Sequence, residues 1–161
     1  MINRIKKTLA MVLVLSFIPA LLTSCTKTPS DTQSFKELAN SKGLVIYDIT
    51  FQYINAPQIK QATVAAPTDK SYQIEFYLIT DSDSARELFQ AHSKVMEDTI
   101  GNSWSGSVSN GKNYARRTLT TDGKYMYLSY IENTILYVPP TPSDNKEIIK
   151  AIKEFVENFH Y

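Results

Sequence analysis

The chain has 161 residues, 43% of them hydrophobic and 20% charged, with a formal net charge of +1, and this length suits a single domain with its own hydrophobic core. The near-neutral charge excludes a polycation built to bind nucleic acid and an acidic interaction tail. The single cysteine, Cys25, excludes an internal disulfide, although exported domains often carry them.

The first 25 residues have the pattern of an export signal. Three cations among residues 4–7 precede an apolar run over residues 9–22, which Ser16 and Pro19 interrupt. A membrane-spanning helix needs ~20 apolar residues, so this run is too short to span a bilayer and has instead the length and flanks of a secretory signal. We therefore expect the rest of the chain to work outside the cytoplasm.

The signal ends in the box Leu22-Thr23-Ser24-Cys25, which resembles the lipobox of bacterial lipoproteins. In that family the cysteine is lipidated and becomes the first residue of the mature protein. The resemblance implies a signal peptide over residues 1–24 and at least two acyl chains on Cys25, enough for stable anchoring at ~0.8 kcal/mol per buried CH₂. It also implies a lipid-anchored protein on the extracytoplasmic face of the cell membrane.

The chain as a whole resembles the small lipoproteins of low-GC Gram-positive bacteria. Thr26 stands where Gram-negative lipoproteins retained in the inner membrane carry an aspartate, so the kind of membrane stays open. Residues 25–33 are expected to form a tether that reaches at most ~30 Å from Cys25 to Ser34, where the first helix is expected. A single domain over residues 34–161 should then lie close to the membrane surface.

Three helices are expected, each opened by a hydroxyl residue three positions before an acid. Such a hydroxyl accepts a hydrogen bond from an orphan backbone N–H, and the acid favours the positive end of the helix. The three boxes are Ser34–Glu37, Ser84–Glu87 and Thr141–Asp144. Gly43 and Gly101 are expected to end the first and second helices.

Six strands are expected from β-branched runs and alternating patterns, at residues 44–50, 59–65, 72–78, 114–121, 124–131 and 134–138. Asp122-Gly123 is a type I′ hairpin signal and Glu132-Asn133 a second tight turn, so the last three strands should form an antiparallel meander. The order α-βββ-α-βββ-α predicts an α+β fold in which the helices pack on one face of an antiparallel sheet. Residues 101–111, rich in Gly, Ser and Asn, are expected to form a mobile polar loop.

No catalytic group emerges from the sequence. Of the two histidines, His160 lies near the end of the chain, and His92 falls on the apolar stripe of the second helix, where a hydrogen-bonded core histidine is the better interpretation. Asp81 and Asp83 begin like a calcium loop but lack its later Gly and Glu, so they are expected to cap a helix. Alternation places Glu75 on the polar, exposed side of its strand. We therefore expect no catalytic residue, no metal and no cofactor.

What remains is an aromatic surface. Tyr125 and Tyr127 share one face of their strand, and if the helices cover the other face, they form with Tyr77 an exposed surface suited to a glycan or a protein. The alternative is that these tyrosines are only good strand formers whose rings cover the backbone. Trp104, in the expected loop, would either anchor a partner or cover one end of the sheet.

The sequence therefore predicts a membrane-anchored, extracytoplasmic lipoprotein that acts as a non-catalytic binding module for an envelope partner. Its expected partners are the membrane, through Cys25, and an envelope protein or glycan, but no nucleic acid. Two alternatives stay open: a lipoprotein that binds a small solute or glycan, and a small glycan-cleaving enzyme that uses a pair of carboxylates.

Overall fold

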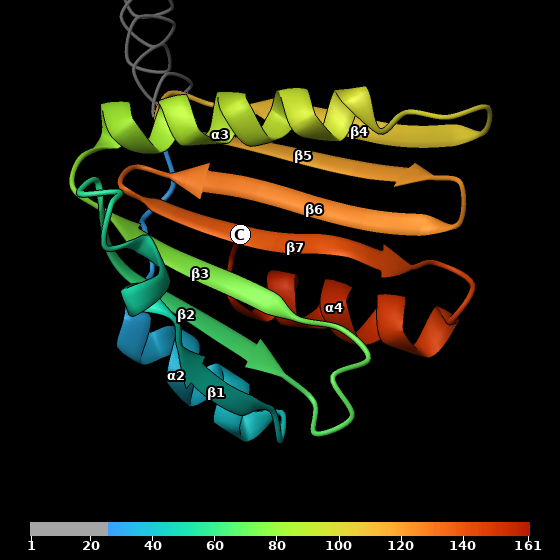
Figure 1. Cartoon of the computed structure of the whole chain (residues 1–161), viewed down its shortest axis with the longest axis horizontal. Helices are drawn as coiled ribbons and strands as arrows, with labels where there is room; N and C mark the ends of the chain where they lie inside the picture. The colour runs from blue at the N-terminus through green and yellow to red at the C-terminus, as the bar shows by residue number, and fades with distance from the viewer. Residues whose placement is uncertain (1–25) are drawn as a thin grey trace, which may run out of the picture.

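The computed structural model describes residues 26–161; the expected signal peptide, residues 1–24, and the expected lipidation site, Cys25, lie outside the described residues. One seven-stranded antiparallel sheet, in the order β1-β2-β3-β7-β6-β5-β4, organises this part of the chain (Figure 1). No helix within residues 26–161 is long and apolar enough to cross a membrane.

The elements are, in chain order, α2 (Thr32–Ser41), β1 (Val45–Asp48), the 3₁₀ helix η2 (Thr50–Tyr53), β2 (Ile59–Ala66), β3 (Ile74–Ile79), α3 (Ser82–Asp98), β4 (Trp104–Asn110), β5 (Tyr114–Thr121), β6 (Lys124–Ile131), β7 (Thr134–Pro142) and α4 (Lys146–Asn158).

The α+β class and the antiparallel sheet are confirmed, but the order α-βββ-α-ββββ-α has one strand more than predicted. The extra strand, β4, occupies the segment that was expected to be a mobile loop, and it pairs with β5 along its whole length. Its sequence does alternate, because Trp104, Gly106 and Val108 are separated by serines, which is the period of two of a strand. The high serine and glycine content, typical of loops, hid this alternation.

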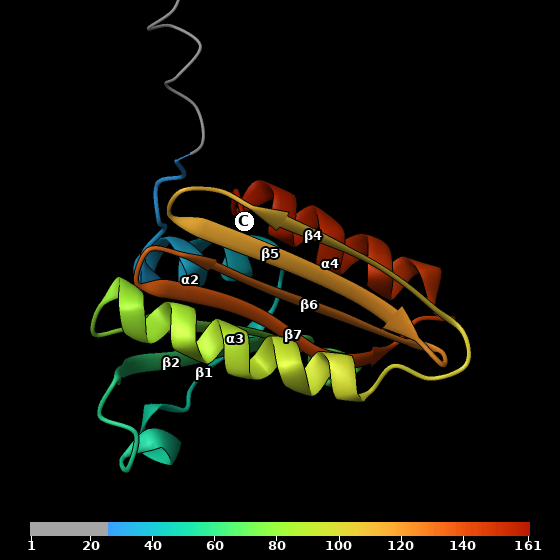
Figure 2. The same ribbon diagram turned by 90° about the horizontal axis from the view of Figure 1, so that it is seen from above.

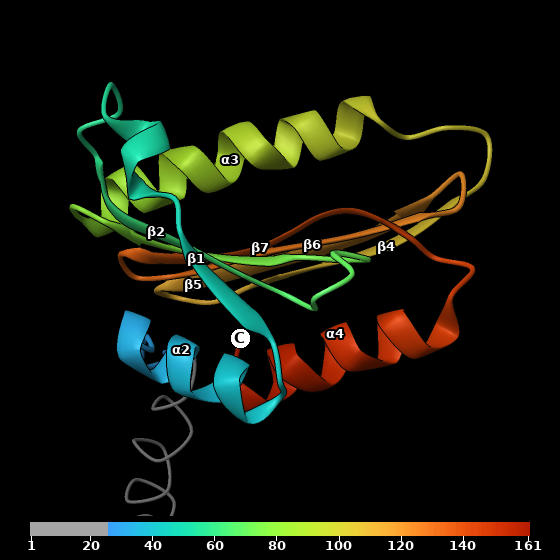
Figure 3. The same ribbon diagram turned by 60° about the horizontal axis from the view of Figure 1, so that its bottom comes forward.

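The expectation that all helices pack on one face of the sheet is wrong. Figures 2 and 3 show α3 on one face and both α2 and α4 on the other. One buried cluster joins Phe35 of α2 and Phe155 of α4 to strand residues such as Leu136, whereas a second joins Phe89 of α3 to strand residues such as Leu128. The central strands carry apolar side chains on both faces, so each face needs its own cover. We call these sides the α3 face and the α2/α4 face.

The helix starts were predicted near the right places, and the expected cap Asp81 is confirmed, but the hydroxyl residues of the three expected boxes are not the caps. In each helix the cap is an Asp or Asn side chain that accepts a hydrogen bond from a backbone N–H three residues later: Asp31 from Ser34 at 2.7 Å, Asp81 from Ser84 at 2.8 Å and Asn145 from Ile148 at 3.2 Å. Ser34 and Ser84 therefore lie inside the first turn and do not cap it. The third expected box fails because Thr141 and Pro142 still belong to β7.

The predicted helix end at Gly43 and the predicted hairpin turns are confirmed, whereas Gly101 does not cap α3, which ends at Asp98 with Thr99 as its C-cap. Gly43 has a φ of 70°, and the N–H of Leu44 donates to the carbonyl oxygen of Ala39 at 3.0 Å, which closes α2 with a Schellman-type cap. Asp122 and Gly123 have φ angles of 45° and 76°, as a type I′ hairpin turn requires. Strands β5, β6 and β7 form the expected meander.

The segment expected to be a tether is bound to the domain. The backbone N–H of Lys27 donates to Asn113 Oδ1 at 2.9 Å, and Asn113 Nδ2 donates to the Lys27 carbonyl at 2.7 Å. The Lys27 ammonium donates to the carbonyl of His160 at 3.1 Å and lies 5.3 Å from the ring centroid of Tyr114. Because α2 then begins at Thr32, the expected domain start at Ser34 is too late. Lys27, two positions after Cys25 in the sequence, is thus held against the domain.

Tyrosines form an unusual share of the α2/α4-face core. Tyr125, Tyr127 and Tyr161 are 5%, 2% and 3% exposed in the cluster that α2 and α4 cover, so the expectation that Tyr125 and Tyr127 form an exposed surface is wrong. The reason is the second helical layer, since α2 and α4 lie on the face that was expected to be open. Burial raises the pKa of Tyr125 to about 12 and raises the pKa values of Tyr127 and Tyr161 further above the ordinary value of 10.0.

We expect the domain to lose stability above about pH 10. In the unfolded chain these hydroxyls ionise near pH 10, whereas in the folded chain they keep their protons to higher pH. The folded state therefore binds more protons, and the free energy of unfolding, constant below this pH, falls by up to ~1.4 kcal/mol per pH unit for each buried tyrosine. Urea unfolding at about pH 8, 10 and 11 measures this slope. The Tyr125→Phe/Tyr127→Phe variant should show a shallower slope, and an unchanged slope would contradict the assignment.

Candidate functional site

The structure separates the residues that the sequence grouped into one surface. Tyr125 and Tyr127 lie in the α2/α4-face core, and Tyr77 of β3 lies on the α3 face, where it is 7% exposed. Trp104 is 59% exposed, but it belongs to the edge strand β4, at the far side of the sheet from β3. No single surface joins these four side chains.

A different cluster forms around Glu75, which the sequence placed on an exposed face. Glu75 lies in β3 between buried neighbours and is only 8% exposed. Its carboxylate accepts a hydrogen bond from Gln73 Nε2 at 2.5 Å and a second, short one from the hydroxyl of Tyr77. The Tyr77 hydroxyl also lies 3.0 Å from that of Tyr53. A carboxylate and two tyrosine hydroxyls thus form one continuous hydrogen-bonded chain.

The helix η2 brings Tyr53 to this cluster. It is fixed to β2 at Ala62, whose N–H donates to Thr50 Oγ1 at 3.0 Å and whose carbonyl accepts from the N–H of Ile49 at 2.9 Å. This attachment holds the Tyr53 ring against that of Tyr77 in an edge-to-face arrangement, with centroids 5.6 Å apart and planes at 86°. Aromatic pairs favour this geometry over a face-to-face stack.

A groove of about 300 Å³ opens on one side of the cluster; we call it the Glu75 groove. Its lining residues are Tyr47, Ile49, Gln52, Tyr53, Val64, Ala66, Lys70, Gln73 and Glu75. At its rim the Lys70 ammonium lies 5.7 Å from the ring centroid of Tyr47, within the distance at which a cation is attracted to an aromatic face. The groove therefore combines aromatic walls with a carboxylate at its base.

A smaller apolar hollow lies on the other side of Tyr53 and Tyr77, where α3 contributes His92. The Nδ1 atom of His92 is 2.9 Å from the carbonyl oxygen of Leu88, one turn earlier, and its ring meets that of Tyr137 edge-on at 5.5 Å. The expected hydrogen bond of this histidine is therefore present, although the side chain is half-buried and not part of a closed core.

The electrostatics of the cluster centre on Glu75. Burial, and secondarily the negative charge of Glu75, raise the pKa of Tyr77 far above its ordinary value and also raise that of Tyr137. Both hydroxyls consequently stay protonated, and that of Tyr77 donates its proton in the hydrogen bond to the Glu75 carboxylate. None of the ion pairs within residues 26–161 includes Glu75. The cluster thus holds a buried carboxylate that hydrogen-bond donors support but no cation neutralises, an arrangement that attracts a cationic ligand.

Within the described part of the chain, no group of three or more His, Cys, Asp or Glu side chains is placed to hold a metal ion. Comparison with the models of known protein families, with curated protein sequences and with solved structures gives no match for this chain. The signal for the Glu75 cluster in the sequence is the run Gln73-x-Glu75-x-Tyr77, which places three polar side chains on one face of a strand. The contribution of Tyr53 has no local signal.

We expect Tyr77→Phe to lower the free energy of unfolding by ~1.5–3 kcal/mol, because it removes a hydrogen bond to a buried charged group. Tyr53→Phe is the matched control. It removes only a bond between two neutral hydroxyls and should cost ~0.5–1.5 kcal/mol. Urea unfolding of Tyr77→Phe, of Glu75→Gln and of the variant that combines them, each compared with the unmodified protein, gives the coupling energy between Tyr77 and Glu75. Additive effects in that cycle would show that the two side chains do not interact.

Proposed function

We propose that this protein is a lipid-anchored, extracytoplasmic binding module that holds the cationic, amine-bearing group of an envelope partner in the Glu75 groove. The observation that carries the proposal is the buried carboxylate of Glu75, which forms no ion pair within residues 26–161 and lines a groove together with Tyr47 and Tyr53. Lys70 lines the same groove, but its ammonium lies over the Tyr47 ring. An ammonium group that enters the groove meets this charge where little water screens it, and the attraction is stronger there than at the surface.

The aromatic walls of the groove favour the same kind of ligand. An ammonium within ~6 Å of a tyrosine ring centroid is attracted by the negative face of the ring, and the energy grows when water is excluded. Lys70 makes this contact with Tyr47 at the rim. The ligand's amine is expected to make the same contact deeper in the groove, where the carboxylate of Glu75 adds its charge.

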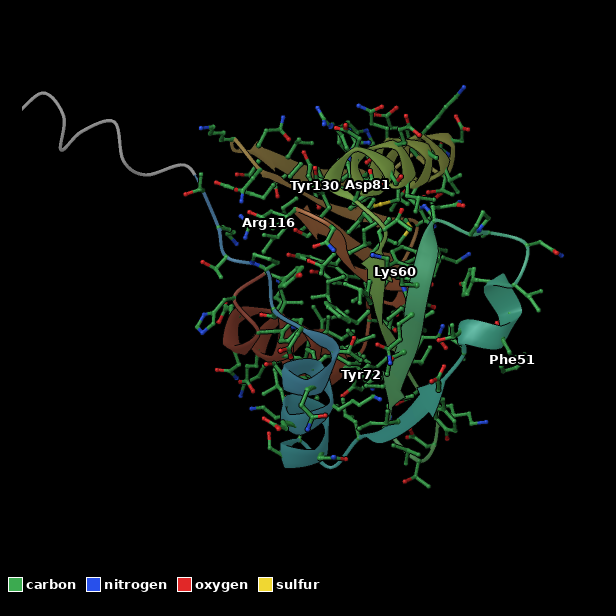
Figure 4. All side chains as sticks on the ribbon, turned by 90° about the vertical axis from the view of Figure 1, so that its left-hand side faces the viewer. Phe51, Lys60, Tyr72, Asp81, Arg116 and Tyr130 are labelled. Carbon is green, nitrogen blue, oxygen red and sulfur yellow. The ribbon has the colours of Figure 1, made fainter. Side chains whose placement is uncertain are left out.

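Exposed apolar surface lies beside the groove, next to Gln52 and Tyr53, which line it. Phe51 and Ile54, on and just after η2, are 73% and 84% exposed, and Figure 4 shows Phe51 on the side of η2 that faces away from the sheet. Exposed large apolar side chains next to a pocket are typical of interaction surfaces. A ligand that carries an apolar group beside its amine therefore fits the groove and its rim together.

The proposed anchor holds the domain with the groove turned away from the membrane. Lys27 is fixed to Asn113, and only Thr26 separates it from Cys25, so the Cα of Cys25 lies within ~7 Å of that of Lys27. Figure 4 shows η2 on the opposite side of the molecule from the N-terminal segment. The groove is thus presented to components of the envelope beyond the membrane surface.

A receptor for a free small amine is the second candidate, because the groove volume of about 300 Å³ lies at the lower end of small-molecule pockets. The two candidate functions differ in whether the ligand needs the exposed apolar side chains of Phe51 and Ile54. A free small amine would bind without Phe51 and Ile54, whereas a larger partner would need them. Loss of partner recovery in Phe51→Ser, with unchanged binding of a small amine, favours the larger partner.

Tetramethylammonium should bind in the Glu75 groove and shift the backbone NMR signals of β3 and η2, with sodium chloride at equal ionic strength as the reference. Glu75→Gln keeps the side-chain shape but removes the charge, so we expect the affinity to fall by at least ~10-fold, which is about 1.4 kcal/mol. Glu87→Gln, on the exposed side of α3, is the control and should bind as the unmodified protein does. Equal affinities in all three proteins would overturn the proposal.

Cys25→Ser should move the protein from the membrane fraction to the soluble fraction and abolish labelling with a radioactive fatty acid, because the thiol that carries the lipid is lost. Thr26→Ala is the control, and it should leave both properties unchanged. Retention of Cys25→Ser in the membrane fraction would show that the chain is held there by something other than a lipid on this residue.

A further inference from the structure

Strand β4 is an edge of the sheet that lacks the usual protection. Edge strands are usually short or interrupted by charges, prolines or bulges, which prevent pairing with another chain. The other edge, β1, has only four residues, whereas β4 has seven residues without any charge or proline and pairs with β5 without a bulge. Trp104 and Val108 of β4 are also 59% and 56% exposed. This edge is therefore open to a further strand.

The sequence of the edge is the same in both directions. Residues 101–111 read Gly-Asn-Ser-Trp-Ser-Gly-Ser-Val-Ser-Asn-Gly, a palindrome about Gly106 in which only Trp104 and Val108 differ, and both of these are apolar. An interface with twofold symmetry requires a surface that is complementary to itself. An antiparallel pair of two such strands, centred on Gly106, places each Trp104 opposite the Val108 of the other copy and each Ser105 opposite the other Ser107.

The backbone has the correct orientation for this pairing. The carbonyl of Ser103 accepts from the N–H of Asp122, and the N–H of Gly111 donates to the carbonyl of Tyr114. The odd-numbered residues of β4 therefore direct their backbone groups toward β5, and because these groups alternate along a strand, Trp104, Gly106 and Val108 direct theirs toward the free edge. In the twofold register these residues face each other and can exchange N–H···O=C bonds in pairs.

The charges beside the strand are complementary in the same register. A Cβ at Gly101 would lie 1.6 Å from Asp122 Oδ2, so the carboxylate of Asp122 lies directly against Gly101. The twofold register pairs Gly101 with Gly111 of the second copy, and the next residue of that copy is Lys112. Just beyond the ends of β4, Lys112 of one copy and Asp122 of the other therefore lie at the same end of the pair.

We propose that two copies of this chain associate through β4, antiparallel about a twofold axis at Gly106, and join their sheets into one. Trp104 packs on Val108 of the second copy on the α3 face, and the serines meet on the α2/α4 face. Cross-strand pairs between aromatic and β-branched side chains stabilise sheets. This inference concerns a part of the molecule separate from the Glu75 groove and does not depend on what the groove binds.

The test uses the full-length chain in its native cell, as two differently tagged copies that carry Ser105→Cys and Ser107→Cys. In the proposed register these positions are directly opposite, with Cα atoms ~4.5 Å apart, which is within the range of a disulfide. Mild oxidation with copper phenanthroline should therefore give a covalent product that carries both tags. Two copies that both carry Ser105→Cys should give much less product, because a diagonal pair is ~7–8 Å apart.

A second variant tests the hydrogen-bonded edge itself. Val108→Pro removes an N–H that points away from β5, so β4 keeps its bonds to β5 but loses bonds to a second copy, and the product with both tags should disappear. Val108→Thr keeps the N–H and a β-branched side chain, and should retain the product. Absence of the Ser105–Ser107 product, its persistence in Val108→Pro, or a product formed only with another protein would each overturn the proposal.

Discussion

The central strands β3, β7 and β6 bury side chains on both of their faces, and the architecture follows from this double burial. Each face needs an apolar cover, which α3 supplies on one side and α2 with α4 on the other. Helix α3 covers β6, β7 and β3 and reaches β5 through Arg117, which donates to the Ser93 carbonyl and to Glu97, so it leaves β1 and β2 without a helix on this face. On one side η2 rises beside β1 and β2 and creates the Glu75 groove. On the other side β4 ends the sheet as an exposed edge.

Six of the seven strands, the hairpin turns and the helix positions could be predicted because their signals are local. Gly43 and Gly123 adopt the left-handed conformations that their positions suggested, and Asp122-Gly123 connects the strands it was expected to connect. The side of the sheet that faces solvent could not be predicted, because alternation shows which residues share a face and not what covers that face. The tyrosines made the exposed face harder to identify. A tyrosine side chain is compatible with both an exposed surface and a core, so the residue type of Tyr125 and Tyr127 does not show which of the two they occupy.

The candidate site was missed because its burial comes from residues far away in the sequence. Glu75 and Tyr77 share a face of β3, and Gln73 precedes the strand at the same spacing, which could be predicted from the sequence. Glu75 pairs with Val64 of β2 and Tyr137 of β7, and its partner Tyr77 contacts Tyr53, 24 residues earlier, which the attachment of Thr50 to Ala62 holds in place. A polar residue in an alternating strand is exposed by default, and only the tertiary structure shows where a second element covers it.

The groove, the anchor and the free edge are compatible with a single assembly. Lys27 lies against Tyr114, which packs on the α2/α4-face core, so the proposed lipid leaves the domain on the face opposite the Glu75 groove. A twofold axis that pairs two β4 strands runs perpendicular to the joined sheet, and the two α3 faces then point in the same direction. Both anchors therefore lie on one side of the pair and both grooves on the other. Eleven strand spacings separate the two β2 strands, so the grooves are ~50 Å apart. Two weak amine sites at this distance on one rigid body would bind a repetitive envelope component more tightly than either site alone.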